Sequence, residues 1–221
     1  MKIVAVIQAR LESKRFPRKS LTLYNGKTLV RNVVGQVKQV RSIDEVVAAI
    51  PIGDDLVLRD EFLASGVDSI EYGSEVDVLQ RVLHAAVLHE ATVVVRVTAD
   101  CPVWSPNAGE GTIQSYVTDK KRRSFWSNDT TMSGWPDGTD VEVFSIELLK
   151  EADKAASSPV RFKAYPEIVN EEREHVTTWM KRNTQCGVYK RTPDRWSKTK
   201  LSVDTPEDLI KLQALDIPVE W

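Results

Sequence analysis

The sequence predicts an α/β fold built on a largely parallel sheet. Short runs of β-branched residues, such as Ile3–Ile7 and Thr92–Val97, alternate with longer segments whose apolar residues recur at helical spacing. This alternation is regular as far as Asp100, which is typical of parallel strands joined by right-handed crossover helices. A parallel sheet covered on both faces by helices is therefore expected.

The elements of the first half follow from apolar spacing and from helix caps. Gly66 stands where a glycine ends a helix, and Ser74 with Asp77 three residues later resembles a capping box. Strands are expected at Ile3–Ile7, Glu45–Ile50, Ser69–Tyr72 and Thr92–Val97. Helices are expected at Lys27–Val40, at Asp54–Ala64 and after Ser74, the last with the buried stripe Val78, Leu79, Val82, Leu83, Ala86 and Val87.

Beyond Asp100 the alternation becomes irregular. Thr205 as a cap, Pro206 at the first helical position and acidic residues in the first turn predict the start of a last helix. The other expected elements are helices at Gly111–Asp119, Ile146–Ala156 and Glu171–Lys181, strands at Val141–Phe144, Gly187–Lys190 and Lys200–Val203, and irregular segments at Lys120–Ser133 and Ser157–Asn170. We expect one domain, residues 1–221, with an inserted substrate and dimerisation lobe around residues 105–185.

Composition excludes several classes of protein. The 221 residues are 42% apolar and 28% charged with a net charge of −2, which argues against a general nucleic-acid or membrane-surface binder. The two cysteines, Cys101 and Cys186, form no CxxC pair, so neither a zinc site nor a disulfide framework is indicated. No apolar run is long enough for a membrane span or a signal peptide, so a cytoplasmic protein is expected.

The segment Gln8–Leu21 (QARLESKRFPRKSL) carries the chain's clearest local charge. Five basic side chains and Glu12 give it a net charge of +4 directly behind the first strand. Phosphate groups need donors and positive charge at fixed spacing, and a loop between strand and helix supplies both. A solvated basic loop without a ligand remains an alternative. The GxxxxGK[ST] phosphate loop is absent, which disfavours a kinase-type or GTPase-type NTPase.

Two aspartates stand at strand ends. Asp100 follows the clearest strand, and Asp204 follows a later expected one. Both could face the crevice at the carboxyl edge of the sheet, where a Mg²⁺ ion would bridge them to phosphates. Asp204 also precedes a helix, so an interaction with the helix N-terminus is an alternative for it.

Other candidate side chains are less specific. His84 and His89 are spaced too loosely for an HExxH site and are expected at the surface or in packing contacts. His175, in a polar cluster, could face a ligand. Cys101 is expected to pack rather than react, and Trp135 could line a pocket.

Several segments together resemble sugar cytidylyltransferases of the spore-coat-polysaccharide-biosynthesis type and, more distantly, the CMP-Kdo and CMP-acylneuraminate synthetases. The opening segment is similar to the family's xARxxSxRxPxK motif. In the same order follow GSEVDVLQR (Gly73–Arg81), VVRVTADCPV (Val94–Val103), PDGTDVEVFS (Pro136–Ser145), REHVT (Arg173–Thr177) and LSVDTPEDL (Leu201–Leu209). Six motifs in register over nearly the whole chain make the resemblance specific.

The resemblance implies a three-layer nucleotide-diphosphosugar-transferase-like fold with a mostly parallel mixed sheet, and a homodimer. It also implies Mg²⁺-dependent transfer of CMP from CTP to an acidic sugar or a phosphonate or phosphate acceptor, with pyrophosphate released. The residues that it implies for the nucleotide are Gln8, Ala9, Arg10, Arg15, Lys19, Gly73, Ser74 and Arg81. Those for the acceptor are Asp137, Asp140, Glu142 and His175. Arg10, Lys19 and Asp100 would be catalytic, and Asp100 and Asp204 would bind the metal.

The chain departs from the family at two loop positions. Glu12 and Arg18 stand where the family usually has glycine, which would let the backbone approach phosphate and adopt a positive φ. Glu12 also repels a triphosphate unless it points away or pairs with a neighbouring cation. Two alternatives therefore stay open: a degenerate nucleotide-binding protein without transferase activity, and a glycosyltransferase that uses a nucleotide sugar. TADCP in place of a plain DxD triplet counts against the second.

Overall fold

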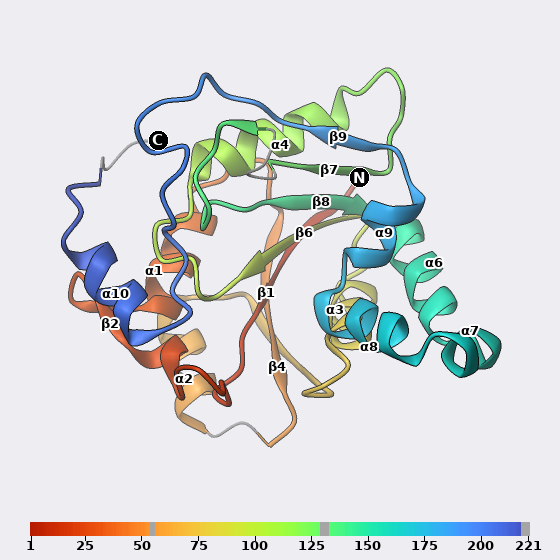
Figure 1. The fold of residues 1–221 in the computed structure, drawn as a ribbon, viewed down its shortest axis with the longest axis horizontal. Helices are drawn as coiled ribbons and strands as arrows, with labels where there is room; N and C mark the ends of the chain where they lie inside the picture. The colour runs from red at the N-terminus through yellow and green to blue at the C-terminus, as the bar shows by residue number, and fades with distance from the viewer. Residues whose placement is uncertain (54–55, 129–132, 218–221) are drawn as a thin grey trace.

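The computed structural model describes residues 1–53, 56–128 and 133–217, and they form an α/β fold around a seven-stranded mixed sheet (Figure 1). The strand order is β5-β4-β1-β6-β8-β7-β9. The strands of this sheet are β1 (Ile3–Gln8), β4 (Glu45–Pro51), β5 (Ser69–Gly73), β6 (Val93–Thr98), β7 (Phe125–Ser127), β8 (Glu142–Ser145) and β9 (Cys186–Val188). Every neighbouring pair is parallel except the two that β8 makes, so the expected mostly parallel mixed sheet is confirmed.

Helices cover both faces of the sheet, and a short hairpin precedes the first long helix. In Figure 1, α3, α6, α8 and α9 lie together on the right and α1 and α2 on the left. The helices are α1 (Leu29–Val37), α2 (Leu56–Ser65), α3 (Val78–Leu88), α4 (Pro106–Val117), α6 (Ile146–Ala156), α7 (Pro159–Ala164), α8 (Pro166–His175), α9 (Thr178–Asn183) and α10 (Pro206–Gln213). The hairpin strands β2 (Leu23–Tyr24) and β3 (Lys27–Thr28) follow the 3₁₀ turn η1 (Lys19–Leu21).

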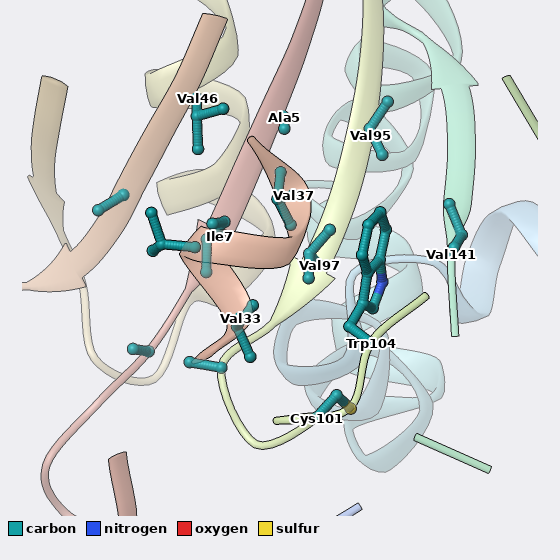
Figure 2. Close-up of a cluster of buried hydrophobic side chains, with 14 of the residues drawn as sticks. Ala5, Ile7, Val33, Val37, Val46, Val95, Val97, Cys101, Trp104 and Val141 are labelled. Carbon is teal, nitrogen blue, oxygen red and sulfur yellow. The ribbon is translucent and has the colours of Figure 1, made fainter. Parts of the chain in front are cut away.

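The sheet separates two apolar clusters, as expected of strands that are buried on both faces. On one face α1, α2, α4 and Trp104 pack against β1, β4 and β6, and Figure 2 shows the indole of Trp104 beside Val97 and Val141. On the other face α3, α6, α8 and α9 pack against the alternate residues of the same strands. Along this second face β6 changes from apolar Val94 to Arg96 and Thr98. The polar site therefore begins where this apolar cluster ends.

The order of the strands creates a crevice at one place on the sheet. The chain runs from β1 outward to β4 and β5 and then returns to β6 on the other side of β1. In open α/β sheets, ligands bind outside the carboxyl ends of the strands at such a switch point. Gln8 and Thr98, the last residues of β1 and β6, are paired in register there. The basic loop begins directly after Gln8, so it lies at this crevice.

Most expected elements of the first half are confirmed, with shifts at their ends. Ile3–Gln8, Glu45–Pro51 and Val93–Thr98 form central strands, and Gly66 takes the positive φ of 81° that its capping position requires. The expected cap at Ser74 is wrong. Asp77 caps α3 by accepting the Gln80 N–H at 3.0 Å, while the Ser74 hydroxyl accepts the Asp77 N–H. Val87, expected in the buried stripe, is 49% exposed.

The first helices begin close to where they were expected. Lys27 and Thr28, expected at the start of a helix, form β3 instead, and Thr28 caps α1 by accepting the Arg31 N–H at 3.2 Å. The expected helix from residue 54 begins at Leu56 within the described part, and residues 54–55 lie outside it.

The second half contains more regular structure than expected. The helix expected from Gly111 begins at Pro106, because Ser105 caps it by accepting the Ala108 N–H at 3.1 Å. The segment expected to be irregular, 120–133, contributes β7. The expected excursion 157–170 forms α7 and the first half of α8, and the helix expected at 171–181 is interrupted where Val176 takes a φ of 51°.

Lys200–Val203 is not a strand. It makes one bridge, from Lys200 to Asp137, and the Leu201 and Val203 N–H groups donate to the carbonyls of Asp137 and Asp100 at 2.8 Å each. These bonds bring Asp204 to the end of β6. The capped start of α10 at Thr205 and Pro206 is confirmed. Because β7 and β8, within residues 105–185, belong to the main sheet, the extent of an inserted lobe stays a prediction.

Two leucines on α2 test how far burial against the sheet stabilises the fold. Leu58 is fully buried and Leu63 is 55% exposed. We expect Leu58→Ala to lower the free energy of unfolding by about 2–5 kcal/mol, because it removes apolar contacts and leaves a cavity. The matched control Leu63→Ala should change it by about 0.5 kcal/mol or less. Urea denaturation followed by circular dichroism measures both, and equal losses would contradict this account of the core.

Candidate active site

A cavity of about 1110 Å³ opens at the switch point of the sheet. Its walls come from the basic loop, the end of β6, the segment between β5 and α3, and the end of α8. The lining residues are Gln8, Ala9, Arg10, Glu12, Ser13, Lys14, Arg15, Pro17, Lys19, Ser20, Glu75, Val76, Val78, Arg81, Arg96, Thr98, Ala99, Asp100, Glu174, His175 and Asp204. Segments nearly two hundred residues apart in sequence therefore form one polar site.

The basic loop is folded back on itself by its own backbone. The Arg18 N–H donates to the Leu11 carbonyl at 2.9 Å, and the Ser20 hydroxyl donates to the Arg10 carbonyl at 3.2 Å. Arg18 takes a φ of 57°, a left-handed conformation that glycine adopts without steric cost. A residue other than glycine thus adopts the left-handed conformation at a position where the resemblance implies glycine. Glu12 is exposed at the cavity wall, and no ion pair joins it to a residue in the described part of the chain.

Lys19 joins three segments of the site. Its Nζ donates to Asp100 Oδ2 at 2.7 Å and to the Val203 carbonyl at 3.1 Å, and lies 3.6 Å from Asp204 Oδ1. The side chain is only 15% exposed. Burial raises the pKa of Asp100, but the charge and the hydrogen bond of Lys19 outweigh it, so the pKa lies below its ordinary value. Asp100 is therefore a carboxylate at neutral pH.

Besides its contact with Lys19, the carboxylate of Asp204 pairs with two further cations. Oδ1 accepts from Arg15 Nη2 at 2.8 Å, and Oδ2 accepts from Lys200 Nζ at 2.9 Å. The Asp204 N–H donates to Asp208, which also closes the capping box of α10. The alternative reading of Asp204 as a helix-end residue is thus partly right, but its carboxylate faces the cavity cations rather than the helix N-terminus.

The two aspartates suit a divalent cation that is completed by a ligand. Asp100 and Asp204 both lie within 3.6 Å of the same ammonium, so their oxygens converge on one point. Over residues 1–53, 56–128 and 133–217, no group of three or more His, Cys, Asp or Glu side chains forms a metal cage. Mg²⁺ is typically held by one or two carboxylates together with substrate phosphates and water. The donor set fits that kind of ion.

The segment after β5 is shaped by a buried arginine. Arg81 is 2% exposed, and its Nη1 donates to the Ser74 carbonyl at 2.5 Å. A Cβ on Gly73 would lie 2.8 Å from the Arg81 Cγ, so glycine is required for this close approach. Arg81 thus fixes the backbone of Gly73 and Ser74 at the wall of the cavity.

Arg173 ties the end of α8 to this segment. It donates to Asp77, the cap of α3, and to the Ser157 hydroxyl at 2.9 Å, and lies 3.7 Å from Asp153. Two residues further along α8, His175 lines the cavity, and Glu174 lies 3.5 Å from Arg10. The helix that closes one side of the cavity is therefore attached to the segment that closes the other.

A smaller cavity of about 300 Å³ adjoins the first and shares Arg96 and Thr98 with it. Glu142 lines it and is 7% exposed. Its carboxylate accepts from Arg96 Nη1 at 2.5 Å, and from the Thr177 hydroxyl and Lys181 Nζ at 2.8 Å each. Burial raises the pKa of Glu142, but these two cations and the hydroxyl lower it to about 2.

The residues expected at the site are distributed over both cavities. Those expected for the nucleotide line the large cavity or, for Gly73 and Ser74, contact its lining residue Arg81. Of those expected for the acceptor, Asp140 and Glu142 line the small cavity and His175 the large one. Asp137 lines neither. Burial and the nearby charges of Asp204 and Asp100 raise its pKa, although Ser202 and Lys200 oppose this. The individual roles stay predictions.

Several polar residues at the cavities were not expected from the sequence. Arg96, Thr98 and Lys181 line the small cavity, and Glu174 pairs with Arg10. Arg96 carries a readable signal, because it is the one charged residue inside the apolar run Thr92–Val97. Lys181 carries none, since exposed lysines on helices are common.

Comparison with known proteins places this geometry in a family. The family model described as cytidylyltransferase matches residues 4–195. The chain belongs to the cytidylyltransferase family. It is accordingly a CTP-dependent nucleotidyltransferase, and the resemblance seen in the sequence is confirmed.

Two related proteins and one solved structure show what this chain is similar to. The spore coat polysaccharide biosynthesis protein SpsF of Bacillus subtilis is 25% identical over 96% of this chain and 85% of its own length. A 3-deoxy-manno-octulosonate cytidylyltransferase of Chloroherpeton thalassium is 32% identical over 53% of this chain and 47% of its own length. The solved structure of a cytidylyltransferase from Leptospira borgpetersenii is 25% identical, with a TM-score of 0.84 over 96% of this chain and 85% of that one.

The expected α/β architecture is confirmed by that structural match. Within the described residues, none of the helices is both long and apolar enough to span a membrane.

The ion pair between Lys19 and Asp100 leads to a testable prediction about the pKa of Asp100. In Lys19→Met the charge and hydrogen bond of Lys19 are lost while burial remains, so the pKa of Asp100 should rise. A ¹³C NMR titration of the aspartate carboxyls measures this. Because the wild-type pKa is lowered by folding, this carboxylate stabilises the protein above its unfolded pKa, and the contribution is lost as pH falls through the folded pKa.

Asp208 is the internal control for that titration. Burial raises its pKa, but hydrogen bonds from Lys200 and from the backbone of Asp204 and Thr205 lower it to about 2. Lys19 contributes to none of these. An Asp100 signal that does not move in Lys19→Met, or an Asp208 signal that moves equally, would contradict the assignment of the shift to Lys19.

Proposed function

We propose that this cytidylyltransferase transfers CMP from CTP to a small acidic sugar or a phosphonate or phosphate acceptor, with Mg²⁺ bound and pyrophosphate released. The observation that carries the proposal is the meeting of the basic loop with Asp100 and Asp204 at the switch point. Loop cations suit the phosphates, and two convergent carboxylates suit a divalent ion that also contacts those phosphates.

The residues that line the large cavity predict the orientation of a bound nucleotide. Arg10, Arg15 and Lys19 line the loop end, where the β- and γ-phosphates would lie. The segment at Glu75 and Val76 lines another wall, near Arg81, and would hold the base and ribose. The α-phosphate would then lie near the ends of β1 and β6, next to the smaller cavity. An acceptor in that smaller cavity could attack the α-phosphorus in line with the departing pyrophosphate.

The protein residues would act by position and charge. The cations at Arg10, Arg15 and Lys19 stabilise the negative charge that moves onto pyrophosphate as the bond to it breaks. Asp100 and Asp204 would hold Mg²⁺, which when bound supplies neutralisation of charge on the phosphate oxygens. No covalent intermediate on the enzyme is needed. His175, exposed at the cavity wall, is proposed to contact the acceptor.

Each of the three loop cations proposed to bind the phosphates has a carboxylate partner in the structure. Arg10 is near Glu174, Arg15 pairs with Asp204 and Lys19 pairs with Asp100. Binding of a triphosphate with its metal would exchange these partners: each cation would gain a phosphate oxygen, and both aspartates would gain the metal. Arg10 and Arg15 are 41% and 67% exposed, so their pairs cost little to open.

The homodimer implied by the resemblance is proposed on the same footing. In its support, α7 and α8 carry the exposed apolar side chains Val160, Phe162, Tyr165 and Ile168. Clusters of this kind are common where proteins associate.

Removal of the central ion pair tests the proposed transfer. We expect Lys19→Ala and Asp100→Ala each to reduce kcat/KM by about 10²-fold or more, because each removes a charge that acts in the transition state. The assay measures pyrophosphate release from CTP and Mg²⁺ across a panel of sugar acids, phosphonates and phosphate monoesters. Lys38→Ala is the control, since Lys38 contacts Gly66 and Asp68 away from the cavity. Wild-type rates in either active-site variant would refute the assignment.

Glu12 makes a separate prediction about nucleotide affinity. Its exposed carboxylate at the cavity wall lacks an ion-pair partner in the described residues, so it should repel a triphosphate. Glu12→Gln should tighten CTP binding by about two- to five-fold, the effect of one screened charge. Glu151→Gln, on the exposed side of α6, is the matched control. Calorimetric titration measures both, and weaker binding in Glu12→Gln would mean that Glu12 contacts the ligand.

A further inference from the structure

The small cavity between β6, β8 and α9 is separate from the space that a nucleotide would fill. At about 300 Å³ it is at the lower limit of small-molecule sites, which suits a molecule of monosaccharide size. Arg96 and Thr98 stand on the boundary, because they line both cavities. A molecule in the small cavity would therefore lie directly beside the proposed position of the α-phosphate.

Arg96 is held rigidly at this boundary. It pairs in register with Glu142 on β8, and its Nη1 donates to Glu142 Oε2 at 2.5 Å. On the other side its Nε donates to Gln8 Oε1 at 2.9 Å. The side chain is 13% exposed. Two edges of the guanidinium are thus fixed, one toward each cavity.

The third nitrogen of Arg96 is available to a ligand. Among the described residues, no hydrogen-bond acceptor contacts Nη2, and this atom is not among the fully enclosed ones without a partner. It is therefore open to solvent, at the boundary between the two cavities that Arg96 lines. A guanidinium has five N–H donors, and in a largely buried position donors are normally matched by acceptors. The remaining donors of Arg96 are placed to bind an anionic oxygen.

The charged residues that line the small cavity are balanced, because Arg96 and Lys181 face Asp140 and Glu142 across it. The Glu142 carboxylate accepts from Arg96, from Lys181 and from the Thr177 hydroxyl. Glu142 is therefore occupied by protein donors, and the case for an anionic ligand rests on the remaining donors of Arg96. Asp140 lines the same cavity with its carboxylate hydrogen-bonded to the Gly138 N–H.

We propose that the small cavity is the acceptor site and that Arg96 binds a carboxylate, phosphonate or phosphate oxygen of the acceptor through Nη2. This inference rests on the proposed function for the position of the nucleotide. Glu142 is then a positioning residue: it aligns Arg96 and Lys181 and has little capacity left for the acceptor itself. Asp140 and Thr98 would contact acceptor hydroxyls. An acceptor without an anionic group would bind poorly.

Orthophosphate is the simplest probe of the Arg96 site. The protein is first saturated with α,β-methylene CTP and Mg²⁺, which fill the large cavity without turnover, and orthophosphate is then titrated by calorimetry. We expect saturable binding to the wild type and at least about ten-fold weaker binding to Arg96→Gln, since a charge-assisted hydrogen bond is lost. Arg96→Lys, which keeps the charge but not the fork, should fall between them.

Two controls keep the result specific. Arg123→Gln removes an arginine that pairs with Asp119 and stacks on Trp126 outside both cavities, and it should bind orthophosphate as the wild type does. Affinity for α,β-methylene CTP should be unchanged in all three variants. If Arg96→Gln does not fold, Arg96→Lys alone decides.

The proposal is overturned if the nucleotide-saturated wild type does not bind orthophosphate, or if the Arg96 variants bind it equally well. It is also overturned if they lose nucleotide affinity instead, because Arg96 would then contact the nucleotide. These readouts need no turnover, so they are distinguishable from failure of the proposed transfer. That failure would appear as the absence of pyrophosphate release while the anion site persists.

Discussion

The ammonium of Lys19 is the point on which the site depends. It joins the loop after β1 to the end of β6 through Asp100, and to the segment before α10 through the Val203 carbonyl and Asp204. The first and last of these segments are nearly two hundred residues apart. Because the Lys19 and Asp100 side chains are only partly exposed, removing one partner would leave the other charge poorly solvated. The contacts of Lys19 thus act together with the backbone bond from Val203 to Asp100 to hold the loop, the end of β6 and the segment before α10 in place.

Arg10, Arg15 and Lys19 are each paired with a carboxylate of the protein, so a polyanion must open these ion pairs in order to bind. The ion pairs of Arg10 and Arg15 are exposed and can open at little cost. The Lys19 side chain is only 15% exposed, so its ion pair is harder to open. Incoming phosphates would meet the outer cations first. Only a ligand that brings its own cation can also satisfy Asp100 and Asp204 once Lys19 turns to phosphate. Nucleotide and metal are therefore expected to bind with positive cooperativity, each raising the affinity for the other.

Much of the fold could be predicted from local sequence. The central strands were predictable because buried parallel strands are continuous apolar runs, and α10 because Thr205, Pro206 and Asp208 form a complete capping signal. Strand β7 was not predicted because three residues are too few to show an apolar periodicity. Its pairing with β8 and β9, which are distant in sequence, stabilises it. Helix α7 and the first half of α8 were not predicted because most of their surface is exposed, so the apolar stripe that marks a helix is weak.

The candidate site was predictable where charge is concentrated along the chain and not where it is paired across the sheet. The excess charge of the loop is visible in fourteen consecutive residues, from Gln8 to Leu21. The role of Glu142 depends on its register with Arg96 and on Lys181 arriving from α9, and neither can be read from local sequence. The positive φ of Arg18 could not be predicted from the residue type, because such a backbone conformation is usually marked by glycine.

The Mg²⁺ dependence of CTP affinity tests the exchange of ion-pair partners most directly. Calorimetric titration of the wild type should give CTP binding about ten-fold tighter or more with Mg²⁺ than with EDTA, because the proposed metal would bind the two carboxylates that Lys19 contacts. In Asp100→Asn that difference should largely disappear. Equal CTP affinity with and without Mg²⁺ in the wild type, or an undiminished Mg²⁺ effect in Asp100→Asn, would contradict this account of the site.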